Sequence, residues 1–136
     1  MISRSPVVLL VDDHEDTVAM YAVGLFAQGF QPLMATDAGE AFSRACVHGP
    51  HVIVVDLAMS VRSGFDLIHQ LRAAPRTHDI PIIVLTGLTL ASVRQQAREA
   101  GCDRFLLKPC LPEALAAEIR DVLLSSEEDW VAAAPS

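Results

Sequence analysis

Short aliphatic runs alternate along the chain with segments in which apolar residues repeat at helical spacing. Three of the runs, Val7–Val11, Val52–Val55 and 82–85, are unbroken and consist mainly of β-branched residues. Two more, Gln31–Ala35 and Arg104–Leu107, each begin with a polar residue. Unbroken apolar runs are typical of strands that are covered on both faces. The pattern therefore predicts five strands with helices packed over them.

The first helical segment is the most clearly marked. Its apolar residues fall on one helical face before Gly29, a residue that commonly ends helices. These residues are Val18, Tyr21, Ala22, Leu25 and Phe26. A second helix over 41–46 is predicted by the capping-box pattern of Thr36, Asp37 and Glu40.

Three further helices follow the third, fourth and fifth strands. The helix over Gly64–Ala73 carries Leu67, Ile68 and Leu71 at helical spacing. The helix over Ala91–Ala100 has the narrowest apolar face, and the last helix begins at Pro112, a residue favoured at the first helical position.

Strand and helix thus alternate five times. Parallel strands need crossover connections, and right-handed crossovers place helices on both faces of the sheet. We therefore expect an α/β fold, a doubly wound five-stranded parallel sheet, in a single domain over residues 1–124. The remaining residues 125–136 are expected to form a frayed acidic tail.

Composition narrows the classes of partner. The chain of 136 residues has 10 basic and 17 acidic residues, a net charge of -7, and no cluster of Lys or Arg, so direct nucleic-acid binding is not expected. Its apolar stretches are far shorter than the roughly 18 residues that cross a bilayer, so no membrane insertion is expected. Three irregularly spaced cysteines and no signal peptide predict a cytoplasmic protein.

Polar residues gather where the predicted strands end. They are Asp12, Asp13, Asp56, Thr86 and Lys108, and Lys108 is the only lysine beside nine arginines. Ligands of open parallel sheets bind beyond the carboxyl ends of the strands. Each residue alone has a plain structural explanation, such as helix capping or a surface charge, but together they predict a site. Clustered carboxylates repel one another unless a cation intervenes, and Mg²⁺ prefers such oxygen ligands.

These residues carry a resemblance that extends from about Val7 to Leu124. The matching motifs are Val11 to His14, Val55 to Met59 with Gly64, Thr86 with Gly87, and Phe105 to Pro109. With them the chain resembles the receiver domain of two-component response regulators, in particular single-domain receivers of the chemotaxis-regulator kind. The resemblance implies a flavodoxin-like sheet of order 2-1-3-4-5 and a cis peptide bond before Pro109.

The resemblance also implies chemistry at the strand ends. Asp56 would be the phosphoacceptor and nucleophile. Asp12, Asp13, Asp56 and the backbone carbonyl of Ala58 would hold Mg²⁺, with Mn²⁺ as an alternative. Thr86 and Lys108 would act in catalysis by binding phosphoryl oxygens.

Thr86 would also act with Phe105 as a switch. In the resembling family the aromatic residue swings inward after phosphorylation, which changes the face made by the helix over Ala91–Ala100, the strand Arg104–Leu107 and the last helix. The implied partners are a histidine kinase or histidine phosphotransfer protein and, on that face, a downstream effector protein. The resemblance leaves open whether the chain forms a homodimer.

The leading interpretation is a phospho-accepting domain that assists its own phosphorylation and dephosphorylation and is not otherwise an enzyme. Two alternatives remain: a receiver-like interaction module that is not phosphorylated, and a receiver fragment of a hybrid kinase or larger regulator. A phosphatase of the haloacid dehalogenase type would need a second acid two residues after the nucleophile, where the chain has Ala58.

Overall fold

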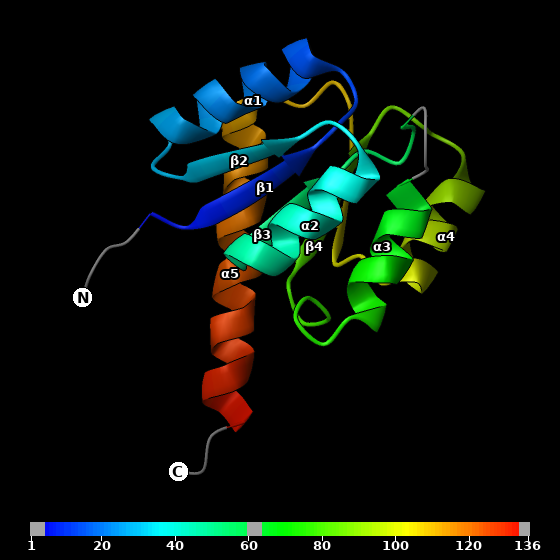
Figure 1. The fold of residues 1–136 in the computed structure, drawn as a ribbon. Coiled ribbons are helices and arrows are strands. Elements are labelled where there is room, and N and C mark those ends of the chain that lie inside the picture. Colours follow the sequence, from blue (N-terminus) through cyan, green and yellow to red (C-terminus); the bar gives the residue numbers. More distant parts are fainter. Residues whose placement is uncertain (1–4, 60–63, 134–136) are drawn as a thin grey trace.

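The computed structural model describes residues 5–59 and 64–133. Strands and helices alternate through both ranges (Figure 1). Their order is β1 Val7–Val11, α1 Glu15–Ala27, β2 Gln31–Ala35, α2 Ala38–His48, β3 Val52–Val55, α3 Gly64–Ala73, β4 Ile82–Thr86, α4 Ala91–Ala100, β5 Arg104–Leu107 and α5 Pro112–Ala133.

The strands form one parallel sheet of order β2-β1-β3-β4-β5. Helices α1 and α5 cover one face, and α2, α3 and α4 cover the other (Figure 1). The predicted doubly wound α/β class is therefore confirmed, and so is the flavodoxin-like strand order that the resemblance implies. No helix in the described part of the chain has both the length and the hydrophobicity needed to span a bilayer.

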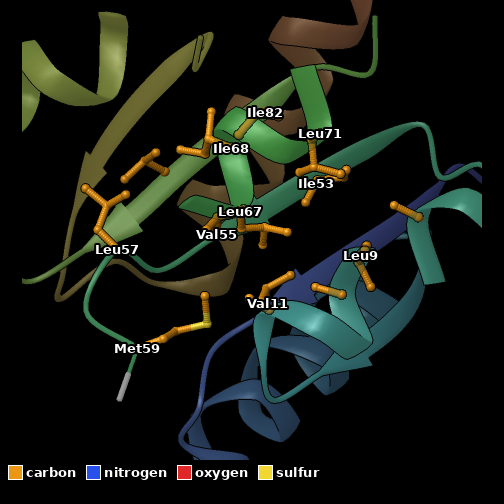
Figure 2. Packing of buried hydrophobic residues seen from close by; sticks show 14 of the residues in the cluster. Leu9, Val11, Ile53, Val55, Leu57, Met59, Leu67, Ile68, Leu71 and Ile82 are labelled. Atoms are coloured by element: carbon orange, nitrogen blue, oxygen red, sulfur yellow. The ribbon is translucent and has the colours of Figure 1, made fainter. Parts of the chain in front are cut away.

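Alternate strand residues enter two separate cores, because successive side chains of a strand point to opposite faces. Leu9, Ile53 and Ile82 are fully buried beneath α2, α3 and α4 (Figure 2). Their neighbours Val8 and Val52 are equally buried beneath α1 and α5. Burying each such side chain contributes about 1.5–3 kcal/mol, so the central strands form a rigid platform for the residues that follow them.

The capping pattern predicted for the second helix is present at the start of α2. The Asp37 side chain accepts a hydrogen bond from the Glu40 N–H at 2.8 Å, and Glu40 Oε1 accepts one from the Thr36 N–H at 2.9 Å. The hydrogen bond from Thr36 stabilises the carboxylate and lowers the pKa of Glu40. These bonds fix the path of the chain from β2 into the helix.

Two expectations about helices differ from the structure. Phe26, assigned from the sequence to the buried face of α1, is 73% exposed. It follows the buried Leu25 by one position, about 100° around the helix, which places it beyond the arc that contacts the sheet. Helix α5 also continues to Ala133, where a frayed end from Ser125 was expected.

The continuation of α5 has a local cause, since residues 125–133 contain neither Gly nor Pro. The last residues of the predicted tail, 134–136, lie outside the described residues. The division into a domain over 1–124 and a tail over 125–136 stays a prediction.

Candidate functional site

The sheet brings the predicted site residues to one edge. Backbone pairing continues past the strands: the Asp56 N–H donates to Val11 O at 3.0 Å and the Lys108 N–H donates to Thr86 O at 2.8 Å. Asp56 therefore follows β3 beside the end of β1, and Lys108 follows β5 beside the end of β4. Thr86 is the last residue of β4, because its pairing with β5 extends that strand one residue beyond the predicted 82–85.

Lys108 forms ion pairs with two of the acidic residues. Its Nζ lies 2.6 Å from Asp12 Oδ2 and 3.5 Å from Asp56 Oδ2. The side chains are 24%, 9% and 8% exposed, respectively. Burial by itself would lower the pKa of Lys108, but the hydrogen bond to Asp12 and the negative charge of Asp56 outweigh it, so the pKa is raised. The ammonium group stays charged at neutral pH and offsets the two buried carboxylates.

Asp56 is held from the other side by its own turn. Its Oδ1 accepts a hydrogen bond from the Ala58 N–H at 3.1 Å. Gly64 approaches the same turn so closely that a Cβ there would lie 2.5 Å from the Asp56 carbonyl oxygen and 2.7 Å from Leu57 Cα. The match of Gly64 to the family motif thus has a steric reason. The role of the Ala58 carbonyl as a metal ligand stays a prediction.

Asp12 and Asp13 are the residues that best fit a divalent cation. His14 Nδ1 lies 3.1 Å from Asp12 Oδ1 and 3.1 Å from Asp13 Oδ1, and one ligand atom from each of the three residues falls within 4.8 Å of the others. Two carboxylates so close together are hard oxygen donors of the kind that hold Mg²⁺. Asp56 adds a third carboxylate, linked to Asp12 through Lys108. The donor set therefore fits the predicted metal.

The two predicted switch residues lie on neighbouring strands. Thr86 is fully buried and its Oγ1 accepts a hydrogen bond from the Leu88 N–H at 3.3 Å. Phe105 is half-buried and packs at the margin of the core beneath α2, α3 and α4. Its ring lies below the guanidinium of Arg94, which is 5.7 Å from the ring centroid. The structure thus places Phe105 between the core and the outer surface of α4.

Tyr21 lies beside Lys108, although its sequence pattern predicted only a place on the buried face of a helix. Its hydroxyl donates a hydrogen bond to the Cys110 carbonyl and so fastens α1 to the loop that follows Lys108. In the same loop the Lys108–Pro109 peptide bond is cis, as expected. A signal was present, since a tyrosine on a buried helical face needs a partner for its hydroxyl, but the partner could not be read from the sequence.

Comparison with known proteins places this site in a family. The family model described as the response regulator receiver domain matches residues 8–120. Over 119 residues the chain is 36% identical to the transcriptional regulatory protein PrrA of Mycobacterium bovis, covering 88% of this chain and 50% of that protein. Over 116 residues it is 31% identical to the phosphate regulon transcriptional regulatory protein PhoB of Escherichia coli, covering 85% and 51%. The chain thus spans about half the length of these curated relatives.

A solved structure supports the same assignment. The chemotaxis protein CheY4 of Vibrio cholerae superposes with a TM-score of 0.83 at 29% identity, over 88% of this chain and 99% of that one. Receiver domains generally bind Mg²⁺ and interact with histidine kinases and effector proteins. The parallel sheet and the ion pairs of Lys108 with the acidic residues agree with these matches. The chain belongs to the response regulator receiver domain family of two-component signalling.

Proposed function

We propose that this receiver domain accepts a phosphoryl group on Asp56 and uses it to change its interactions with other proteins. The observation that carries the proposal is the position of Lys108 Nζ, 2.6 Å from Asp12 and 3.5 Å from Asp56. The ammonium can transfer its charge-assisted contact from a carboxylate to a phosphoryl oxygen that arrives between the same residues. An Asp56 oxygen attacks phosphorus, an O–P bond forms, and the N–P bond of the donor phosphohistidine breaks as the imidazole leaves.

The other residues of the site position and stabilise the reacting groups. The Ala58 N–H holds the Asp56 carboxylate in place, and the Thr86 hydroxyl donates to the phosphoryl group once it is bound. Mg²⁺, or Mn²⁺ in its place, would be held by Asp12, Asp13, Asp56 and the carbonyl of Ala58 and would supply positive charge against the phosphoryl oxygens. The chain assists its own phosphorylation and dephosphorylation and is not otherwise an enzyme.

The consequence of phosphorylation is a change at the face of α4, β5 and α5. Thr86 moves toward the phosphoryl group and Phe105 enters the space behind it. The donor is a histidine kinase or histidine phosphotransfer protein in the cytoplasm, and an effector protein binds the altered face. Because the curated relatives are about twice as long, a receiver within a larger regulator is the second form in which the same chemistry would operate.

Intact mass measurement after incubation with Mg²⁺ and acetyl phosphate tests this proposal. We expect one phosphoryl adduct on the wild type and none on Asp56→Asn. Asp79→Asn is the matched control, because Asp79 lies on an exposed loop away from the site, and it should be phosphorylated like the wild type. A wild type that gains no adduct would favour the interaction module that is not phosphorylated, and an adduct on Asp56→Asn would place the acceptor elsewhere.

A further inference from the structure

A second feature of the molecule lies on the face of α4, β5 and α5. A hollow of about 250 Å³ opens there. Among its lining residues are Arg94 and Arg98 of α4, Arg104 and Phe105 of β5, and Glu118 of α5. Three arginines around one hollow are unexpected in a chain whose net charge is -7. The hollow lies away from the strand-end site, and the proposed phosphoryl chemistry does not use its arginines.

The three arginines differ in how their charges are balanced. Arg104 is already neutralised, since it lies 3.1 Å from Asp121 and 3.9 Å from Glu118. The nearby Asp103 is engaged by Arg72 at 3.0 Å. Among residues 5–59 and 64–125, no carboxylate forms an ion pair with Arg94 or Arg98.

The spacing of Arg94 and Arg98 along α4 also suits a partner that is itself a helix. Both side chains are exposed, and residues four apart lie on the same helical face, about 6 Å apart along the axis. Two carboxylates four residues apart on another helix have the same separation. Each guanidinium can bind a carboxylate through two parallel N–H donors, which gives direction as well as affinity.

The contact between Arg94 and Phe105 links this pair to the switch. With the guanidinium 5.7 Å from the ring centroid, the aromatic face partly satisfies the positive charge of Arg94. If Phe105 moves inward, Arg94 loses that contact and the space of the ring is added to the hollow. Phosphorylation would then leave two guanidinium groups, neither paired with a carboxylate among residues 5–59 and 64–125, on an enlarged concave surface.

We propose that the hollow lined by Arg94 and Arg98 binds an acidic helical segment of the effector protein, and that Phe105 regulates this binding by covering or releasing Arg94. The inference rests on the proposed function, because it requires that Asp56 be phosphorylated. It adds the chemistry of the partner, paired carboxylates on one helical face, and a specific contact that the switch breaks.

The test uses the full chain and two labelled helical peptides of Ala, Leu and Gln. One peptide carries Glu at two positions four residues apart, and the other carries Lys at the same two positions. Fluorescence anisotropy is measured with and without acetyl phosphate and Mg²⁺, and intact mass reports the phosphoryl adduct in the same samples. We expect the Glu peptide to bind the phosphorylated chain about tenfold more tightly than the unphosphorylated chain, and the Lys peptide to show no such gain.

Variants locate the binding site. Arg94→Gln and Arg98→Gln should each weaken binding of the Glu peptide by about tenfold. Arg76→Gln removes the same charge from the loop before β4, where Arg76 donates to the Cys46 carbonyl at 3.2 Å, and should leave binding unchanged. Phe105→Leu removes the ring below Arg94 and should raise binding by the unphosphorylated chain toward the phosphorylated level.

Each outcome decides between the two proposals. A phosphoryl adduct with no gain in binding of the Glu peptide overturns the inference alone. The inference is also overturned if Arg76→Gln weakens binding as much as Arg94→Gln and Arg98→Gln do, because the peptide would then respond to the net charge of the chain and not to a particular site. Absence of the adduct contradicts the proposed function and, with it, regulation by phosphorylation.

Discussion

Replacing Lys108 with methionine removes the ammonium group that lies between two nearly buried carboxylates. In the native structure Lys108 Nζ is 2.6 Å from Asp12 and 3.5 Å from Asp56, whose side chains are only 9% and 8% exposed. Methionine keeps a long unbranched side chain, so packing changes little. The substitution therefore isolates the electrostatic part of the contact.

The expected loss of stability follows from this geometry. Two opposite unit charges about 4 Å apart attract by about 4 kcal/mol at an effective dielectric constant near 20. Removing one partner of a buried pair costs about 3–5 kcal/mol, because a charge is left without a partner. Lys108 itself is 24% exposed, so water reaches the emptied position and the loss should be about 2–3 kcal/mol. For a domain of this size that corresponds to a fall in Tm of roughly 8–12 °C.

Thermal unfolding followed by circular dichroism at neutral pH measures this loss. The matched control is Arg104→Met, which breaks contacts with the more exposed Glu118 and Asp121 and should cost less than about 1 kcal/mol. Mg²⁺ should restore more stability to Lys108→Met than it adds to the wild type, since the carboxylates of the variant lack their own cation. A fall in Tm no larger than that of Arg104→Met would refute the argument that Lys108 compensates the buried acids.

Three further substitutions test other parts of the structure. Gly64→Ala places a Cβ 2.5 Å from the Asp56 carbonyl oxygen, so it should cost about 1–3 kcal/mol and slow phosphorylation by acetyl phosphate; unchanged stability and rate would contradict the steric explanation. Thr77→Val removes the hydroxyl that donates to the Leu71 carbonyl at 2.6 Å, and urea unfolding should show a loss of about 1–2 kcal/mol. Glu40→Gln should lower Tm at neutral pH. Because the pKa of Glu40 is lowered in the folded protein, its stabilisation is present above the pKa of the unfolded chain and is lost as pH falls through the folded pKa. The difference in Tm should therefore shrink in acid, and a constant difference would show that the cap does not depend on the charge.

Local sequence patterns were sufficient to predict the order of strands and helices and the polar residues at the strand ends, although the ends of β4 and α5 differed from the prediction. The run Val52–Val55 had one satisfactory interpretation, a strand covered on both faces, and the structure buries all four residues. Asp56 and Lys108 were predicted to be neighbours because parallel strands end at the same edge of a sheet. The order of the strands, by contrast, came from the resemblance to a family, since alternation of strands and helices is compatible with several orders.

Periodicity failed where a helix is apolar on more than one face. Phe26, like Met20 and Val23, lies on the exposed side of α1, although each is as apolar as the buried Leu25. Which side of α1 is buried depends on the width of the sheet and on the position of α5. Both are set by segments far from α1 in the sequence.

The side chains that reach the functional edge follow from local sequence, because strand propensity and turn chemistry are encoded within a few consecutive residues. The contacts between their atoms follow from the folded arrangement. Lys108 contacts Asp12, 96 positions away, more closely than Asp56, and Arg94 lies over Phe105. Such contacts depend on how the crossover helices set the distances between strands and on the rotamers that packing allows, and neither is a property of any single segment.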